Sequence, residues 1–275
     1  MNQDMTIVFV GFDGYSDMWD DCMNLFHRFW KDCPYPVMFV NNSKAVEYEN
    51  VEVLHAGDDA EWSRKVQLAV ERADTPYICL LLEDFFVGEK IDTDVIKDTL
   101  KLIAEDDIRY FKIVNNNRPL KNRDANYKGI KYLHVVPEND EYGVSLQAAI
   151  WKKDYLKEVL GTENYNAWKF EFDRVKEAEG KTGRPSKGVL VDDRNILKIK
   201  HGVMQSKYLP FTVKYFKKKG LDLNIQREVM SYPQYFRYWI VSAGKEILLK
   251  SWRVRVKHLL EKCGMKFVST MRDKE

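Results

Sequence analysis

The sequence is poor in the residues that would build a metal centre or a disulfide-bonded scaffold. Its 275 residues include only four cysteines, which are far apart and form no CxxC pair. Its five histidines are scattered, without the HExxH or HxH spacing of zinc sites. We therefore expect reduced thiols, a cytoplasmic protein and no zinc site.

Several other signatures are missing. There is no G-x-x-x-x-G-K-[ST], no G-x-G-x-x-G and no G-x-S-x-G, which argues against a P-loop, a standard dinucleotide fold and a hydrolase nucleophile elbow. A net charge of +2 does not indicate a nucleic-acid binder. No stretch reaches the roughly 18 apolar residues of a membrane span. The first ten residues contain an acid and only a short apolar run, so we expect no signal peptide.

What is present is a globular composition, with 45% hydrophobic and 31% charged residues. A chain of this length can form one large domain, or one domain with an appendage. The most informative stretch is P-Y-I-C-L-L-L-E-D-F-F-V, residues 76–87. Its uninterrupted apolar run predicts a strand buried on both faces, as in parallel sheets. Glu83 and Asp84 follow at once, where α/β enzymes bind ligands. A plain acidic turn is the alternative.

Strands and helices alternate along the chain. Apolar runs predict strands at residues 6–10, 36–40, 51–54, 77–82, 110–114 and 144–151. Helical spacing and caps predict helices at residues 16–30, 58–73, 94–105, 153–160 and 168–178. Residues 115–129 and 180–188 have loop composition. This order predicts an α/β fold with a mostly parallel, mixed sheet flanked by helices.

The last 50 residues, 226–275, differ from the rest. They are rich in aromatic and basic residues, and their apolar residues fall near helical spacing. A basic amphipathic helix with interfacial Trp and Tyr suits an anionic membrane surface. The same helix could instead pack on the core or on a partner subunit, as in a homodimer. Both interpretations stay open.

Five segments together resemble a bacterial glycosyltransferase of the GT-A type, of the kind that assembles polysaccharide and lipopolysaccharide. They are W-S-R-K at residues 62–65, Y-I-C-L-L-L-E-D-F-F at 77–86, S-L-Q-A-A-I-W at 145–151, W-K-F-E at 168–171 and H-G-V-M-Q-S-K-Y-L-P at 201–210. The resemblance implies a GT-A-like, Rossmann-like domain at residues 1–225. The last 50 residues fall outside it, and their composition and spacing predict a helical extension at residues 226–275. It also implies transfer of a sugar, with inversion, from a nucleotide-sugar donor to a glycan or lipid-linked acceptor.

By this resemblance, Glu83 and Asp84 hold a divalent cation, Mg²⁺ or Mn²⁺, on the donor diphosphate. The third position of the family's acidic motif is Phe85 here, so cationic side chains are the alternative. The implied donor-binding residues, besides the acidic pair, are Gly11, Phe12, Asp13, Tyr15, Asn41, Arg64, Lys65 and Lys207. Each also has an ordinary interpretation as a turn, a loop cap or a solvated helix face.

The resemblance makes Glu171 the catalytic base, and Gln147, Trp151 and Trp168 contacts of the acceptor or the donor sugar. Glu171 could equally be an exposed helix residue, and Gln147 a buried structural hydrogen-bonding group. Asp192 and Asp193 form a second acidic pair, which we expect to cap a turn. Two other functions remain open: a non-catalytic nucleotide-sugar or glycan-binding protein, and a membrane-associated assembly scaffold on the inner face of the cytoplasmic membrane.

Overall fold

The computed structural model describes residues 4–114 and 126–247, with side chains at the C-terminal end described as far as residue 240. The chain divides into two compact units. The first comprises Met1–Asn116 and Arg123–Val229, and the second comprises Asn117–Asn122 and Met230–Glu275. Most of the predicted loop at 115–129 and the basic residues beyond 247 lie outside the described residues. The predicted division at residue 225 stays a prediction.

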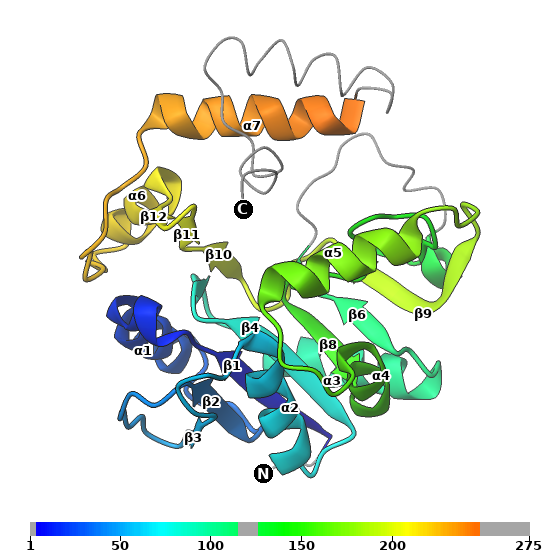
Figure 1. Cartoon of the computed structure of the whole chain (residues 1–275), viewed down its shortest axis with the longest axis horizontal. Helices are drawn as coiled ribbons and strands as arrows, with labels where there is room; N and C mark the ends of the chain where they lie inside the picture. Colours follow the sequence, from blue (N-terminus) through cyan, green and yellow to red (C-terminus); the bar gives the residue numbers. More distant parts are fainter. Residues whose placement is uncertain (1–3, 115–125, 248–275) are drawn as a thin grey trace. The chain divides into compact units, whose positions relative to one another are not determined.

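The first unit is built on an eight-stranded sheet in the order β3-β2-β1-β4-β8-β6-β9-β7 (Figure 1). Its strands are β1 Met5–Val10, β2 Val37–Asn41, β3 Glu52–His55, β4 Tyr77–Leu82, β6 Tyr110–Lys112, β7 Leu133–Pro137, β8 Ala149–Lys152 and β9 Pro185–Asp192. β1 to β4 are mutually parallel, β8 is antiparallel to β4 and β6, and β7 is antiparallel to β9. The predicted mostly parallel, mixed α/β class is confirmed.

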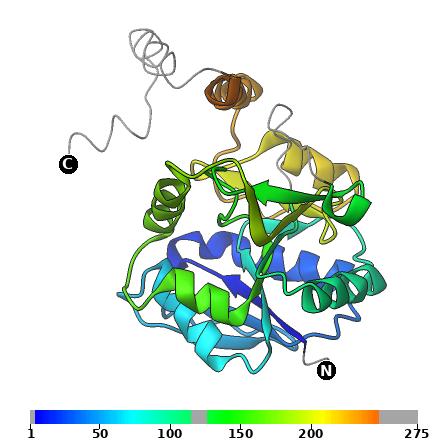
Figure 2. The ribbon, with the colours of Figure 1, turned by 90° about the vertical axis from the view of Figure 1, so that its right-hand side faces the viewer.

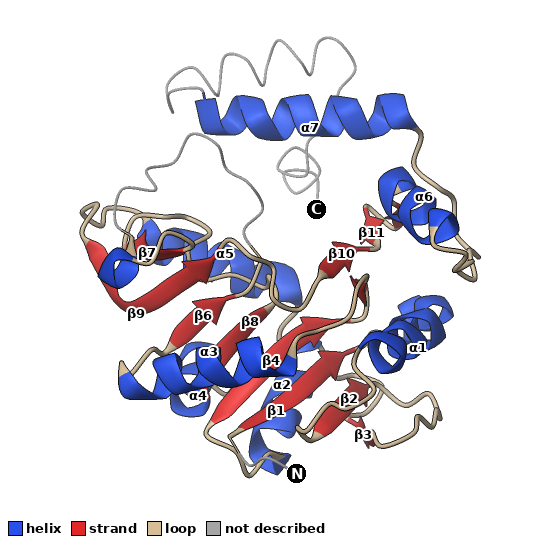
Figure 3. Cartoon of the chain, turned by 180° about the vertical axis from the view of Figure 1, so that it is seen from behind, coloured by secondary structure: helices blue, strands red, loops and turns tan. Residues whose placement is uncertain are grey.

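Hydrophobic helices cover both faces of this sheet (Figures 2 and 3). One face packs against α1 Trp19–Phe29 and α3 Thr93–Glu105. The other packs against α2 Trp62–Arg72, α4 Lys153–Leu160 and α5 Ala167–Ala178. Alternate residues of β4 enter the two cores, Cys79 into one and Ile78 into the other. This double burial explains why β4 is apolar without interruption.

Smaller elements complete the described residues. The 3-10 helix η1 Asp13–Met18 follows β1, and η2 Tyr127–Gly129 precedes β7. β5 Phe85–Val87 pairs with β10 Ile199–His201, and β11 Val203–Met204 pairs with β12 Lys207–Tyr208 ahead of α6 Pro210–Lys218. None of these four short strands was predicted, and in the eight-stranded sheet two strands were also missed: β7, and β9, whose first residues fall in the segment expected to be a loop. β8 begins at Ala149, five residues later than expected.

The second unit includes α7, Tyr232–Ile247. A helix in the C-terminal extension is thereby confirmed for this segment. Its exposed hydrophobic side chains are Tyr232, Phe236, Tyr238, Trp239 and Ile240. Within residues 4–114 and 126–247, no helix combines the length and the apolar character needed to cross a bilayer.

Candidate functional site

The carboxyl ends of β1 and β4 lie side by side at the point where the strand order reverses. β2 and β3 follow on one side of β1, while β4 pairs with its other side and aligns Val10 with Leu82. In open α/β sheets, ligands bind outside the carboxyl ends of the strands at such a reversal. Gly11 and Glu83 are the next residues along the two strands, so this edge is the candidate site.

Two carboxyl groups occupy the end of β4. Burial, followed by the neighbouring charge of Asp84, raises the pKa of Glu83 to about 8, although Lys65 and the Phe12 backbone N–H oppose the rise. Burial also raises the pKa of Asp84 to about 6, against a hydrogen bond from the Val203 backbone N–H. At neutral pH, Asp84 is therefore mostly ionised and Glu83 largely protonated. A cation bound here would favour both as anions.

The third position of the acidic motif is part of the core. Phe85 is 3% exposed, and its ring meets the His201 ring edge-on at a centroid distance of 5.0 Å. The β5–β10 pairing aligns these two residues, and the Gly202 N–H donates to the Asp84 carbonyl at 2.7 Å. Burial lowers the pKa of His201 to about 4, so its imidazole is neutral. Sequence spacing gave no sign of this neighbour, because more than a hundred residues separate the two strands.

A buried lysine joins the ends of β1 and β2. Lys65 is 3% exposed, and its Nζ donates to the Gly11 carbonyl at 2.9 Å and to Asn42 Oδ1 at 3.1 Å. Burial lowers the pKa of Lys65, while Glu83, Asp13 and Glu61 oppose that shift. We expected this ammonium to face the base or the phosphates. The structure instead directs it inward, where it fixes two loops of the site to α2.

Asp13 holds the same loops from the other side. Its carboxylate accepts the backbone N–H groups of Asn42, Ser43 and Lys44 at 2.9, 3.1 and 2.9 Å. Partial burial raises the pKa of Asp13, but these three N–H groups and Lys65 outweigh it, so that the net shift is downward. Asp13 is therefore ionised across the neutral range and acts as an anchor for the segment after β2.

Gly11 and Asn41 serve the framework of this edge. A Cβ on Gly11 would come within 2.8 Å of the Phe39 ring and 3.0 Å of the Trp19 ring, so close packing against aromatic rings requires glycine. Asn41 is fully buried; its side chain donates to the Lys44 carbonyl at 2.8 Å and pairs with His55 Nδ1 at 2.7 Å. Phe12, in contrast, is 52% exposed at the end of β1.

The last part of the first unit lies across η1. The Tyr15 hydroxyl pairs with Ser206 Oγ at 2.7 Å, and Arg227 lies over the Tyr15 ring at 4.0 Å while pairing with Asp17 at 2.6 Å. Lys207 follows in the same β11–β12 hairpin, and its Nζ pairs with Glu228 at 2.8 Å. The structure thus brings Tyr15 and the hairpin carrying Lys207 together.

Glu171 lies at the same edge of the sheet as the acidic pair. β8 runs antiparallel to β4, so the residues that lead into β8 stand beside the carboxyl end of β4. Glu171, near the start of α5, accepts the Leu146 N–H at 2.6 Å through Oε1. Gln147 is the next residue and is half-buried. The structure therefore places Glu171 of α5 and Gln147, which precedes β8, at the same sheet edge as Glu83 and Asp84, which follow β4.

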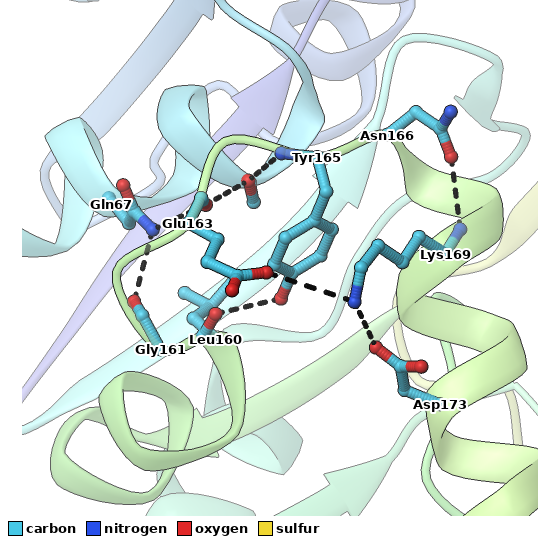
Figure 4. A network of polar contacts seen from close by, with 9 residues as sticks. Gln67, Leu160, Gly161, Glu163, Tyr165, Asn166, Lys169 and Asp173 are labelled. Atoms are coloured by element: carbon cyan, nitrogen blue, oxygen red, sulfur yellow. Dashed lines mark hydrogen bonds and ion pairs between the residues drawn. The ribbon is translucent and has the colours of Figure 1, made fainter.

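Helix α2 holds both halves of this edge. Ser63 Oγ donates to the Glu163 carbonyl and accepts the Tyr165 N–H, each at 2.8 Å, and Gln67 Nε2 donates to the Gly161 and Glu163 carbonyls (Figure 4). These bonds fix the 161–166 loop that leads into α5. Since Lys65 on the same helix holds the ends of β1 and β2, α2 positions the loops on one side and Glu171 on the other.

Three other residues predicted to contact a substrate differ in their exposure to solvent. Trp151 is fully buried in the core, with Tyr110 at 4.4 Å and Phe170 at 6.2 Å between ring centroids, so its indole offers no surface to a sugar. Trp168 is 66% exposed in the first turn of α5 and remains available. Arg64 is exposed on α2, where its Nη1 donates to Gln67 at 3.3 Å.

The second acidic pair makes local contacts. Asp192 is fully buried, accepts the Arg194 backbone N–H at 2.7 Å and forms a two-point pair with the Arg194 guanidinium. This is the turn-capping role predicted for it. Asp193 pairs with His134 Nε2 at 2.8 Å.

The residues present fit a divalent cation only in a limited sense. In the described part of the chain, no three His, Cys, Asp or Glu side chains are grouped to hold a metal ion. Glu83 and Asp84 are two adjacent carboxyl oxygen donors, which is the number that Mg²⁺ takes when substrate phosphates supply the remaining ligands. The site therefore fits a cation that arrives with, or is completed by, a diphosphate.

Comparisons with known proteins are limited. No family model matches this sequence, and no curated protein matches it either. Among solved structures, the chain is similar to TarS 1–349 of S. aureus in complex with UDP, at 12% identity and a TM-score of 0.45, over 69% of this chain and 60% of that one. The chain thus spans about three fifths of that protein's length.

Two further solved structures are similar over more of their own length. One is the galactosyltransferase LgtC in complex with donor and acceptor sugar analogues, at 10% identity and a TM-score of 0.37, over 90% of this chain and 99% of that one. The other is a cytidylyltransferase from Leptospira borgpetersenii, at 11% identity and a TM-score of 0.40, over 84% and 100%. Likeness at this level carries no argument about activity.

Proposed function

We propose that the chain is a glycosyltransferase that moves a sugar from a nucleotide-sugar donor to a glycan or lipid-linked acceptor. The observation that carries this proposal is the meeting, at the strand-order reversal, of a half-buried carboxyl pair with a third carboxylate, Glu171 of α5, which is bonded to the segment leading into β8. Two of these groups can face a cation and a diphosphate, and the third can face an acceptor hydroxyl.

In the proposed reaction, Glu171 accepts the proton of the acceptor hydroxyl as its oxygen attacks the anomeric carbon. The bond between that carbon and the diphosphate oxygen breaks, and the diphosphate leaves with the electron pair. Attack opposite the leaving group inverts the anomeric centre. Glu83 and Asp84 would hold a divalent cation, Mg²⁺ or Mn²⁺, which neutralises charge on the diphosphate when it is bound.

The donor would lie along the carboxyl ends of β1 and β4. Phe12 and Tyr15 offer aromatic rings beside Gly11, while the Asp13 and Lys65 contacts keep this edge in one arrangement. Preorganised groups need no rearrangement when charge develops on the substrate. Lys207 would approach the diphosphate if its pair with Glu228 opened. Trp168 and Gln147 would line the acceptor side.

The wider setting is part of the same proposal. We place the enzyme in cell-envelope polysaccharide or lipopolysaccharide synthesis, at the inner face of the cytoplasmic membrane, where a lipid-linked acceptor would be available. The basic, aromatic C-terminal segment motivates contact with an anionic membrane. Its packing on a second subunit in a homodimer is the alternative.

The first test concerns the donor. A panel of nucleotide sugars is screened by thermal shift and calorimetry, with and without Mn²⁺, on the native chain and on Asp84→Ala. We expect donor affinity or turnover to fall at least tenfold in the variant, which is about 1.4 kcal/mol. Unchanged affinity and activity in Asp84→Ala would remove the carboxyl pair from the donor site.

The second test concerns the base. Glu171→Gln keeps the shape of the side chain but removes its proton acceptor, so the transfer rate should fall by about 10²-fold while donor affinity persists. Glu158→Gln, which removes an exposed carboxylate of α4, is the matched control. Transfer at the native rate by Glu171→Gln would move the base to Asp173 or Asp193.

A non-catalytic nucleotide-sugar or glycan-binding protein is the second candidate, favoured by the phenylalanine at the third motif position. It predicts donor binding without turnover or donor hydrolysis. An assembly scaffold predicts lipid or partner binding without nucleotide affinity. The same screen separates the three.

A further inference from the structure

Three short segments of the first unit form a surface patch that is almost purely cationic. They are residues 88–90, 198–200 and 214–219, and together we call them the lysine patch. Its lysines are Lys90, Lys198, Lys200, Lys214, Lys217, Lys218 and Lys219. Glu89 is the single carboxylate in these twelve residues, so they carry a net +6, whereas the whole chain carries +2. The rest of the chain is therefore net negative, and the excess positive charge is concentrated here and in the basic residues 226–275.

The three segments are joined around Tyr215. Its hydroxyl contacts the Gly88 carbonyl at 3.0 Å and Glu89 Oε1 at 2.7 Å. Lys200 and Lys219 lie over the Tyr215 ring at 4.6 and 4.9 Å, and Lys219 also donates to the Gly88 carbonyl at 3.1 Å. The hydrogen bond from Tyr215 lowers the pKa of Glu89. Burial opposes this shift, and the charges of Lys219, Lys200 and Lys198 lower the pKa further. The patch is thus one fixed surface.

Helix electrostatics accounts for only part of this charge. Lys217 and Lys218 lie in the last turn of α6, where cations interact favourably with the helix dipole. Lys90, Lys198 and Lys200 belong to other elements and gain nothing from that dipole. Gathering so many ammonium groups costs free energy through mutual repulsion, which a partner of opposite charge would relieve.

The chemistry of the patch selects the kind of partner. Every cation in it is lysine, a hydrated point charge suited to a diffuse anionic surface, and none is arginine, whose fork binds single phosphates at two points. Lysine ammonium groups cover the Tyr215 ring, so it cannot stack on a nucleobase as nucleic-acid binding requires. Phe211, 45% exposed, lies one turn before Lys214 and Tyr215 on the same face of α6. An aromatic side chain beside basic ones suits a membrane interface.

We propose that the lysine patch docks the first unit on a membrane surface rich in anionic lipids. The patch consists of residues other than the C-terminal segment, and the proposal does not depend on sugar transfer. Clusters of four to eight basic residues are typical of proteins that bind anionic lipid surfaces, and each residue adds to the attraction within about one Debye length.

The test is flotation of the full-length chain with vesicles of phosphatidylcholine containing about one third phosphatidylglycerol. The variant Lys214→Glu/Lys217→Glu/Lys218→Glu reverses three exposed charges of the patch. The matched control Lys97→Glu/Lys101→Glu/Lys157→Glu makes the same charge change on α3 and α4. We expect the patch variant to lose about 100-fold in partition coefficient at low salt, the control to lose much less, and the difference to shrink at high salt.

Several outcomes would overturn the proposal. They are an intact chain that stays unbound at low salt, equal binding by patch variant and native chain, or equal losses in the patch and control variants. Native binding to heparin or single-stranded DNA but not to vesicles would assign the patch to a soluble polyanion instead. If the patch variant misfolds, acetylation of the native chain decides: lysines of the patch should be protected by anionic vesicles and not by neutral ones. Equal labelling in both would end the proposal.

Discussion

The two sides of the candidate site use their polar residues in opposite ways. At the ends of β1 and β2, the side chains of Asp13, Asn42 and Lys65 form hydrogen bonds with the protein's own backbone and with each other. At the start of α5, Trp168 and Phe172 are exposed. The first side is therefore rigid before any ligand binds, while the second offers side chains that a ligand can still contact. Under the proposed function, the first side would hold the donor in a preorganised site and the second would contact the acceptor.

The strongest test of this difference between the two sides is to remove the buried ammonium group of Lys65. Lys65→Met leaves the Gly11 carbonyl and Asn42 Oδ1 without their shared donor and removes a positive charge from between Asp13 and Glu83. We expect a loss of about 3 kcal/mol in the free energy of unfolding. Arg64→Met, the exposed neighbour on the same helix, should change it by less than about 0.5 kcal/mol. Urea denaturation of both variants measures the difference, and equal values would deny Lys65 its structural role.

Removing the anchor on the other side of the loop should cost less. Asp13→Ala frees three backbone N–H groups, one of them at Asn42, which is 6% exposed. We expect a loss of about 2 kcal/mol, with Asp13→Asn losing less because its amide oxygen can still accept. The pKa of Asp13 is lowered, so its contribution should be present above pH 3.8 and vanish as pH falls through the lower folded value. A pH-independent difference between Asp13→Ala and the native chain would contradict this.

Glu83 should show the opposite pH dependence. Its pKa is raised from 4.5 to about 8, so the folded chain holds a proton that the unfolded chain has released. Between those two values, the free energy of unfolding should fall as pH rises. Glu83→Gln removes this slope, and we expect the variant to gain on the order of 2 kcal/mol relative to the native chain between pH 5 and pH 8. Stability curves at several pH values, without added metal, provide the measurement; parallel curves for the two proteins would refute the burial argument.

We expect the smallest effect on stability from a substitution on the exposed side, at Trp168 of α5. Trp168→Ala should change the free energy of unfolding by no more than about 0.5 kcal/mol, because the indole is mostly in solvent. If Trp168 contacts the acceptor, its removal should raise the acceptor KM about tenfold and leave donor affinity alone. Phe172→Ala, on the next turn, serves as the control. A stability loss of several kcal/mol would mean that this side is as structural as the other.

The helices and strands that the sequence predicted best are those whose pattern is local and does not depend on which other strand or helix they pack against. β4 and α4 match their predicted bounds, since an unbroken apolar run and a clean helical period are both local. β9 was missed because its first half, Pro185–Gly188, has loop composition and becomes a strand only by pairing with β7. Such pairing depends on residues far apart in the sequence, which local periodicity does not report. β7, Leu133–Pro137, was not predicted although its leucine and two valines favour a strand, because the run is only five residues long and is interrupted by His134.

The candidate site divides in a similar way. The acidic pair and its place at a strand end were predictable from residues 76–87. The sequence did not predict the direction of the side chains. Lys65 is buried and Arg64 is exposed, although both lie in the first turn of α2. Trp151 is buried in the core, although its motif resembles a sugar contact. The bond between Glu171 and Leu146 joins residues that no sequence pattern connects. These outcomes follow from tertiary packing, which decides which face of each element is buried.

The position of α2 has a consequence for recombining this chain with others. An exchange of acceptor specificity would normally swap the α5 region between homologous chains and leave the first strands untouched. Here the 161–166 loop is bonded to Ser63 and Gln67, so a crossover placed between residues 73 and 161 would separate partners that fit each other. A working chimera would have to carry α2 and that loop from the same parent, and α2 in turn brings Lys65 and the loops it holds. Under the proposed function, donor and acceptor specificity would therefore be exchanged together.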